Sequence, residues 1–138
     1  MRKILLVVAI LFLSFYSLIS QVDERITTLD FVQILNGNRA EAVHYYEHNW
    51  KALRVKAAKL GYIHSFELLE TPITESEPFH FILITTYKNG EQYEKREEHF
   101  GKLIEERGSQ KLLNEKKPDD FRKILFYKEG VRHWKSGD

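Results

Sequence analysis

The spacing of hydrophobic residues changes along this chain, and the changes separate strands from helices. Residues 25–34 are rich in β-branched and aromatic side chains, which is typical of a β-strand. After an Asn-Gly break, apolar residues recur three and four positions apart and form one stripe along a helix that ends at Gly61. The stripe consists of Val43, Tyr46, Trp50, Leu53, Ala57 and Leu60. Asn38, followed three residues later by Glu41, predicts a capping box at the start of this helix.

The second half of the chain repeats this order of elements. Residues 62–70 and 121–128 predict a second and a fourth strand, and residues 79–87, apolar on both faces, predict a central third strand. One side of the second strand is expected to carry Tyr62, His64, Phe66 and Leu68. A second helix follows Asn89 with a similar capping pattern and ends at Gly108. Its inner side is expected to carry Tyr93, Arg96, Phe100, Leu103 and Ile104.

The resulting order, βαββαβ, predicts an α+β fold of the ferredoxin-like type. Two strand–helix–strand halves with right-handed crossovers form a four-stranded antiparallel sheet that carries both helices on one face. The chain has 138 residues, which leaves room for one domain. We therefore expect a single ferredoxin-like layer and no second domain.

The order of elements resembles that of the dimeric α/β-barrel superfamily, which includes antibiotic-biosynthesis-monooxygenase-like and NIPSNAP-like domains. The resemblance covers residues 25–128. It rests on the first strand ending at Asn36-Gly37-Asn38-Arg39, the long helix bearing Tyr and Trp residues, and the second helix after Asn89-Gly90. It implies a homodimer whose sheets pair into a shared barrel, often with a ligand between helices and sheet. Because it is a resemblance of element order, it assigns no catalytic residue to this chain.

The first twenty residues have the pattern of an export signal. Arg2 and Lys3 form a basic start, residues 4–19 carry no charge, and the small residues Ser17 and Ser20 lie near the expected cleavage point. We expect cleavage after residue 20 and a mature domain of residues 21–138 in the periplasm or outside the cell. The alternative is that the segment is retained as a membrane anchor, since the uncharged run approaches the length that spans a bilayer. After cleavage, no membrane association is expected.

Charge and cysteine content exclude several classes of function. The chain has 21 Lys and Arg residues against 20 Asp and Glu residues. This balance argues against nucleic-acid binding, which requires a clustered positive face. It has no cysteine, which excludes disulfides, thiolate metal sites and a thiol nucleophile. No glycine-rich phosphate loop, nucleophile elbow or paired-carboxylate motif is present, so no cofactor is implied by a motif. We expect no nucleic-acid partner.

Arg96 is the residue that most suggests a ligand. It falls among the inner apolar positions of the second helix, where burying a guanidinium requires either a partner within the chain or a ligand. If a ligand is held there, the residues expected to line its pocket are Tyr46, Trp50, His64 and Arg96. The alternatives are an ion pair within the chain for Arg96, and a purely core or interface role for the other three residues.

Two further features have more ordinary interpretations. Asp30 lies on the apolar side of the first strand, and we interpret it as a solvated residue at a sheet edge, although it would need a partner if covered. His44, Glu47 and His48 fit the H-x-x-E-H motif of some zinc peptidases. They point almost opposite to the apolar stripe of their helix, so we interpret them as a solvated helix face and expect no metal site.

Three functions remain open from the sequence. The favoured hypothesis is an exported homodimer that binds a small aromatic or anionic ligand between helices and sheet. The second is a cofactor-free monooxygenase or haem-degrading type of enzyme, which rests on the resemblance alone. The third is a structural or interaction dimer with no ligand. A structure with no cavity beneath the helices, and with Arg96 paired within the chain, would favour the third hypothesis over the first.

Overall fold

Four strands and a layer of helices make up the computed structural model, which describes residues 22–134. The strands are β1 (Ile26–Ile34), β2 (Ser65–Glu70), β3 (Phe81–Tyr87) and β4 (Arg122–Arg132). The helical segments are α2 (Arg39–Tyr45), the π-helical turn η2 (Tyr46–Trp50), α3 (Lys51–Lys59), α4 (Gly90–Glu94), α5 (Arg96–Arg107) and α6 (Pro118–Phe121). All strand pairs are antiparallel, in the order β2-β3-β1-β4. The predicted βαββαβ order and antiparallel sheet are confirmed.

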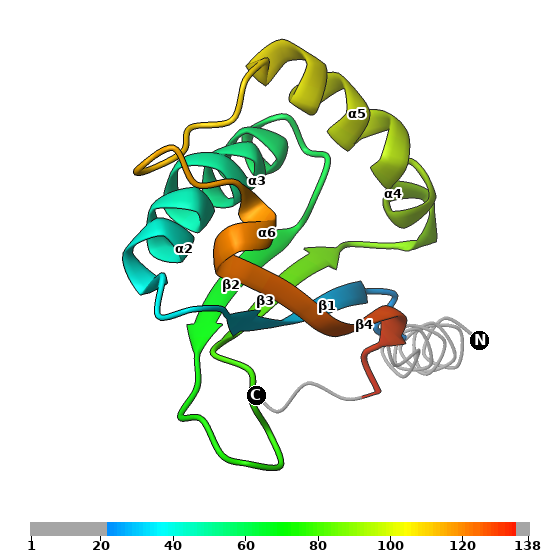
Figure 1. The fold of residues 1–138 in the computed structure, drawn as a ribbon. Helices are drawn as coiled ribbons and strands as arrows, with labels where there is room; N and C mark the ends of the chain where they lie inside the picture. Colours follow the sequence, from blue (N-terminus) through cyan, green and yellow to red (C-terminus); the bar gives the residue numbers. More distant parts are fainter. Residues whose placement is uncertain (1–21, 135–138) are drawn as a thin grey trace, which may run out of the picture.

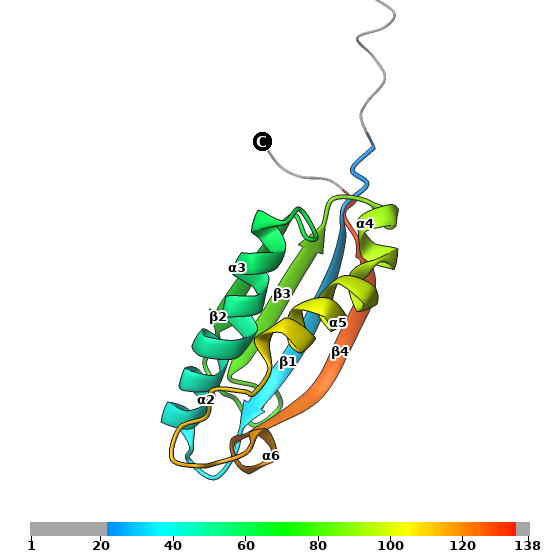
Figure 2. The same ribbon diagram turned by 90° about the horizontal axis from the view of Figure 1, so that it is seen from above.

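The helices α2, α3 and α5 lie on one face of the sheet (Figures 1 and 2). Helix α3 runs above β2 and β3, and α5 packs chiefly against α3. The opposite face carries no helix within residues 22–134 (Figure 1). The described part of the chain thus has two layers, and the sheet separates the helix-covered surface from a second surface.

The first helix departs from the predicted regular stripe because it contains a π-helical turn at residues 46–50. The wider turn leaves Asn49 buried beside Tyr46 and Trp50. Leu53 and Ala57 stay buried as predicted, while Leu60, at the end of α3, is 51% exposed. The predicted capping box is also wrong. The Asn38 side chain makes no cap hydrogen bond and instead donates to the backbone carbonyl of Asp120, while Glu41 accepts from Asn114.

The second helix is divided into α4 and α5 at Lys95, whose backbone leaves the helical region. Asn89 does cap the first turn, since its side chain accepts a hydrogen bond from the backbone of Gln92 at 3.0 Å. The helix ends at Gly108 as predicted. Leu103 is buried and Tyr93 and Phe100 pack against the same cluster, as predicted, whereas Ile104 is 47% exposed.

Two predictions about strand residues are wrong. The second strand begins at Ser65, so His64 precedes it and is exposed instead of sharing the inner side with Phe66. Strand β1 lies between β3 and β4, so Asp30 occupies an inner strand and not a sheet edge. Its side of β1 is the one that carries the buried Val32 and Ile34, which face the helices.

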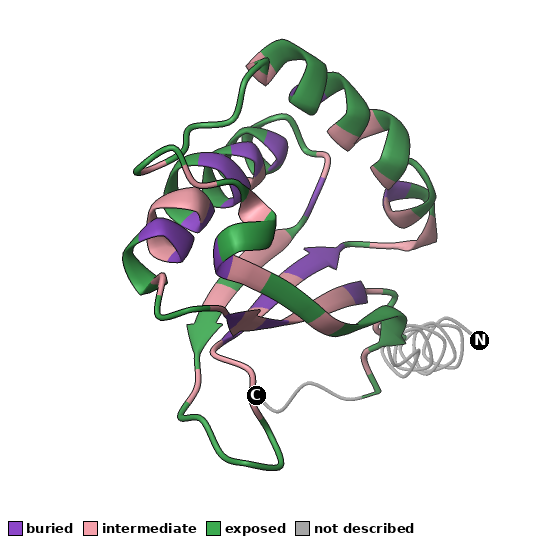
Figure 3. Cartoon of the chain, in the orientation of Figure 1, coloured by how far each residue is buried: buried purple, intermediate pink, exposed green. Residues whose placement is uncertain are grey.

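The core consists of two clusters of buried residues. Figure 3 shows buried stretches of the chain on both the helices and the strands. The larger cluster joins η2 to the middle of the sheet and consists of Val32, Ile34, Ala42, Tyr46, Trp50, Phe81, Leu83 and Phe121. The smaller one joins α3 to α5 and consists of Leu53, Ala57, Ile63, Tyr87 and Leu103. Tyr46 and Trp50 are thus core residues, which accounts for their place in the apolar stripe.

The described helices are all short or polar, and none of those within residues 22–134 could cross a bilayer. The predicted export signal, residues 1–20, lies outside the described residues.

Candidate functional site

Two aromatic side chains of η2 carry buried polar atoms without partners. The Tyr46 ring is 1% exposed and its hydroxyl has no hydrogen bond among the described residues. The indole Nε1 of Trp50 is likewise buried and unpaired. Burial raises the pKa of Tyr46 to about 12, against the opposing effect of the nearby Arg122 guanidinium. Because native structures satisfy nearly all buried polar groups, two such atoms on one helical turn mark this region for closer study.

Asn49 holds η2 in place. Its side-chain amide donates to the backbone carbonyls of Tyr45 and Lys111, and its oxygen accepts from the Lys111 backbone at 2.8 Å. The buried Asn49 therefore fastens the loop after α5 to the π-helical turn. This contact helps to position the neighbouring Tyr46 and Trp50 side chains on the same turn.

Arg54, on α3, is the most unusual charged residue of the helix-covered surface. Its guanidinium carbon lies 4.6 Å from the centre of the Trp50 ring and 4.5 Å from the centre of the Phe100 ring. Its Nε donates weakly to the Thr85 hydroxyl of β3 at 3.4 Å. No carboxylate within residues 22–134 forms an ion pair with it. Burial lowers the pKa of Arg54 to about 10, so it stays charged at neutral pH.

Asp30 and Arg122 complete the group of polar side chains beneath η2 and α3. Asp30 makes no hydrogen bond or ion pair with any other described residue, and burial raises its pKa while the charges of Arg54 and Arg122 oppose the rise. The Arg122 guanidinium lies 5.0 Å from the centre of the Tyr45 ring, and its buried Nε has no partner among the described residues. We call Asp30, Tyr46, Trp50, Arg54 and Arg122 the inner polar cluster.

Sequence reasoning missed Arg54 and misjudged Arg96. The Arg96 guanidinium stacks on Tyr93 at 4.0 Å and lies 3.6 Å from carboxylates of Glu97 and Glu129. Its charge is therefore met within the chain, which was the alternative interpretation. A signal for Arg54 was present, since it follows Trp50 by four residues and so shares its helix face.

The remaining predicted residues lie away from the inner polar cluster. His64 is exposed at the start of β2 and only its backbone contacts β3. His44 and His48 stack on each other at 4.1 Å on the outside of the first helix, and Glu47 pairs with Lys51. No group of three or more metal-binding side chains occurs in the described part of the chain. Of the four predicted pocket residues, Tyr46 and Trp50 come together, and His64 and Arg96 do not join them.

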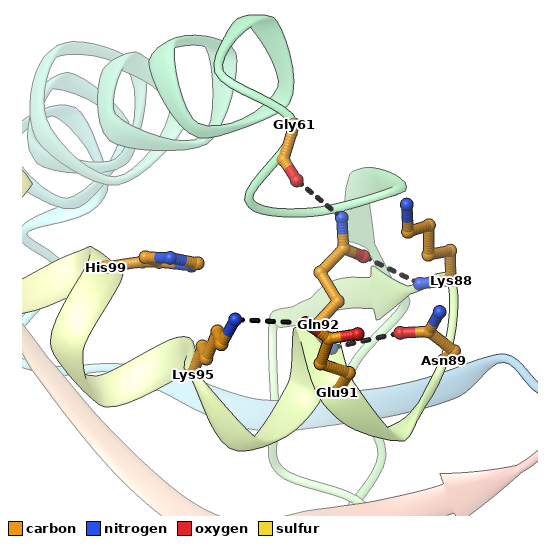
Figure 4. A pocket seen from close by; sticks show the side chains of 7 residues that line it. All are labelled: Gly61, Lys88, Asn89, Glu91, Gln92, Lys95 and His99. Atoms are coloured by element: carbon orange, nitrogen blue, oxygen red, sulfur yellow. Dashed lines mark hydrogen bonds and ion pairs between the residues drawn. The ribbon is translucent and has the colours of Figure 1, made fainter.

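Two hollows on the surface lie away from the inner polar cluster. One, of about 180 Å³, lies between the end of α3 and the start of α4 (Figure 4). There the Gln92 side chain donates to the Gly61 carbonyl and accepts from the Lys88 backbone, so it ties two turns together. The other, of about 480 Å³, lies beside Val22 and Arg132 at the start of the described chain. Neither contains a residue of the inner polar cluster.

The chemistry of the inner polar cluster favours an anion with a flat apolar body. Two guanidinium groups without ion-pair partners, Arg54 and Arg122, outnumber the one carboxyl group, Asp30. A guanidinium that lies between two aromatic rings can still offer N–H groups to a carboxylate or phosphate. The aromatic rings provide the apolar surroundings in which such a contact is strong.

No family model matches this chain, and no curated protein matches it either. Among solved structures, the crystal structure of HapK from Hahella chejuensis is similar in fold, with a TM-score of 0.50 and 10% sequence identity. The match covers 82% of this chain and 97% of that chain. At this identity the likeness concerns the fold alone, and it supports the assignment of an α+β, four-stranded antiparallel fold of the βαββαβ type.

Proposed function

We propose that this protein is an exported homodimer that binds a small aromatic anion between its helices and its sheet. The observation that carries the proposal is the half-buried Arg54 guanidinium, which lies between two rings without a carboxylate partner in the described residues. Removing a cation from water costs free energy unless an opposite charge meets it. Since the chain supplies no ion-pair partner to Arg54, the ligand is proposed to supply it.

The neighbouring side chains define the ligand further. The unpaired Tyr46 hydroxyl and Trp50 indole N–H are two hydrogen-bonding groups that a ligand oxygen can satisfy. The rings of Trp50 and Phe100 favour a planar ligand body over a bulky aliphatic one. Benzoate has both required features, a planar ring and one negative charge, and so serves as the probe.

The test is a calorimetric titration of the protein with benzoate, with benzamide as the uncharged ligand of the same shape. Wild type should bind benzoate and bind benzamide at least about tenfold more weakly, a difference of about 1.4 kcal/mol. Arg54→Met should lose that preference. Arg96→Met is the matched control and should bind benzoate within about twofold of wild type. Equal binding of the two ligands, or loss of binding in the Arg96 variant alone, would contradict the proposal.

The sheet face opposite the helices, where Phe79 packs on Phe31 and Phe126, supports the homodimer. Strand register places the residues of this face in rows that cross all four strands. One row is apolar throughout and consists of Leu69, Ile82, Phe31 and Phe126. The neighbouring row begins with Glu67 on β2, continues with Ile84 and Leu29, and ends with Lys128 on β4. Phe31 and Phe126 stack with ring centres 4.3 Å apart.

A second copy of this chain fits the charges of this face. If two sheets stack about a two-fold axis parallel to the strands, β2 of one copy lies over β4 of the other. Glu67 then faces Lys128 of the second copy, twice per dimer, while the apolar rows meet in the middle. The resemblance to dimeric α/β barrels, whose members pair their sheets, points to the same assembly.

Light scattering of the purified protein tests the dimer. Wild type should have the mass of two chains, and Phe31→Asp should have the mass of one, because it places a charge in the middle of the apolar row. Glu67→Lys should weaken the dimer, and the double variant Glu67→Lys/Lys128→Glu should restore it. Val55→Asp, on the outer side of α3, is the control and should remain dimeric. A monomeric wild type would contradict the assembly without affecting the ligand proposal.

A further inference from the structure

Two Asn-Gly dipeptides occur in the chain, at residues 36–37 and 89–90, and the fold holds them differently. Residues 36–37 are exposed and have φ angles of 54° and 69°, so they form the centre of a tight turn between β1 and α2. One backbone hydrogen bond, from the N–H of Asn38 to the carbonyl of Leu35 at 2.9 Å, closes this turn. The first dipeptide thus lies on the surface, where few bonds hold it.

The second dipeptide begins α4 and is held more firmly. The Asn89 side chain accepts a hydrogen bond from the backbone of Gln92 at 3.0 Å, and the Asn89 carbonyl accepts one from the backbone of Tyr93 at 3.1 Å. Gln92 is buried, and its side chain bonds in turn to the Gly61 carbonyl and the Lys88 backbone. A rotation of Asn89 would therefore open the start of α4 and disturb a buried residue.

The two asparagine side chains also use opposite atoms. The Nδ2 of Asn36 donates to the backbone carbonyl of Asp120 at 3.2 Å, whereas the Oδ1 of Asn89 accepts from the backbone N–H of Gln92. A carboxylate accepts hydrogen bonds but cannot donate them. Conversion to aspartate would remove the bond of Asn36 and place a negative charge against a carbonyl oxygen, while Asn89 would keep its cap.

We propose that Asn36 is a site of deamidation in the folded protein, and that the reaction loosens the attachment of α6 to the turn before α2. The Gly37 backbone nitrogen, after losing its proton to hydroxide, attacks the side-chain carbon Cγ of Asn36. A C–N bond forms, the bond from Cγ to Nδ2 breaks, and ammonia leaves with a proton taken from water. Water then opens the cyclic imide at either carbonyl, which leaves aspartate or isoaspartate at position 36.

The rate of this reaction depends on how often the segment opens. The chain must rotate at the asparagine until its Cγ meets the next backbone nitrogen, and a glycine there leaves that nitrogen unshielded by a side chain. At Asn36, opening breaks the turn and one exposed bond to Asp120. At Asn89 it breaks the cap of α4. Local opening is more frequent where fewer bonds are lost, so Asn36 should react first.

The consequence of the reaction follows from the contacts of α6. The side chains of Asn36 and Asn38 both donate to the Asp120 carbonyl, and the backbone N–H of Leu35 donates to the Phe121 carbonyl at 2.9 Å. These bonds attach the short helix α6 to the end of β1. A carboxylate at position 36 would repel the Asp120 carbonyl oxygen, so the amide of Leu35 should open more often. This inference does not depend on the proposed function.

The first experiment measures deamidation of the whole protein at mildly alkaline pH, both folded and in urea. Trypsin releases the two dipeptides in separate peptides, residues 26–39 and 89–95, and fragmentation in the mass spectrometer separates Asn36 from Asn38. In urea, Asn36 and Asn89 should react within about threefold of each other, because only the local sequence acts there. In the folded protein, Asn36 should react at least about tenfold faster than Asn89. Equal rates in the folded protein, or no reaction at Asn36, would overturn the site.

The second experiment measures the effect of the product. Asn36→Asp carries the same carboxylate as the aspartate product, and Asn89→Asp is the matched control because a carboxylate still caps α4. Hydrogen exchange of the Leu35 amide should be at least about threefold faster than in wild type in Asn36→Asp, and unchanged in Asn89→Asp. An unchanged Leu35 amide in Asn36→Asp, or equal acceleration in both variants, would overturn the loosening of α6.

Discussion

Two arginines on neighbouring helices, Arg54 on α3 and Arg96 on α5, have opposite relations to their surroundings. Both stack on aromatic rings, but Arg96 also approaches the carboxylates of Glu97 and Glu129 at 3.6 Å. Arg54 has two rings and one weak hydrogen bond to Thr85. An inward-facing arginine is therefore not in itself a sign of a ligand site; what matters is whether the chain neutralises its charge.

The largest expected effect comes from removing the support of the inner polar cluster. Asn49→Ala deletes three hydrogen bonds, of which two join η2 to Lys111 in the loop after α5 and one goes to the backbone carbonyl of Tyr45 in α2. At about 1 kcal/mol for each bond, with two backbone groups left unsatisfied, the free energy of unfolding should fall by about 2–4 kcal/mol. Urea denaturation measures this change, and benzoate binding should weaken with it because Tyr46 and Trp50 lose their positions.

Asn114→Gly is the control for this prediction, because Asn114 is exposed, has a φ of 53° that glycine adopts without strain, and makes one side-chain bond, to Glu41. The loss of stability in this variant should stay at about 1 kcal/mol or less. If the two variants were equally stable, the π-helical turn would not depend on Asn49.

Replacing each arginine by methionine should change the free energy of unfolding in opposite directions. Arg54→Met replaces a half-buried charge without an ion-pair partner by an apolar side chain of similar length, so the free energy of unfolding should rise by up to about 1 kcal/mol. Arg96→Met removes partly exposed ion pairs and should lower it by about 1 kcal/mol or less. Thermal unfolding of both variants against wild type provides the measurement. A large loss of stability in Arg54→Met would show that its charge is compensated within the protein.

A smaller effect should appear in the pH dependence of stability. Burial raises the pKa of Asp30, so the folded state holds this proton more tightly than the unfolded state does. The stability of wild type relative to Asp30→Asn should therefore fall as the pH rises above the ordinary pKa of an aspartate, and should level off once the folded-state carboxyl group is ionised.

Asp23 provides a control of opposite sign. The Arg25 side chain, through a hydrogen bond at 2.6 Å, holds the pKa of Asp23 well below its ordinary value. The stability of wild type relative to Asp23→Asn should thus increase with pH over the range below that ordinary value. Urea unfolding at a series of pH values tests both aspartates. Parallel curves for the two variants would contradict the placement of Asp30 between helices and sheet.

Most of the fold could be predicted from the sequence because it follows from periodicity. Residues alternate between the two faces of β1, and apolar residues such as Tyr46 and Trp50 recur every three or four positions in the first helix. Each pattern indicates which side of its element is buried. Patterns of this kind were sufficient to predict the βαββαβ order. The capping box at Asn38 was wrong for a tertiary reason, since the side chains of Lys116 and Asn38 meet across 78 residues of sequence. Local patterns carry no information about such a partner.

The candidate site could be predicted only in part. Tyr46 and Trp50 were found because they belong to the apolar stripe. Arg54 lies at the border of that stripe, where a charged residue is ordinarily interpreted as exposed to solvent. Asp30 was placed at a sheet edge because the strand order of the sheet cannot be read from β1 alone. The pairing of Arg96 with Glu129 depends on β4, more than thirty residues later in the chain.

The most direct measurement is an NMR titration that follows the side-chain Nε–H signals of the arginines as benzoate is added. The signal of Arg54 should shift and saturate with the binding curve, while that of Arg96 stays in place. Movement of the Arg96 signal alone, or no movement at Arg54 at saturating benzoate, would contradict the assignment of the anion site to the unpaired arginine.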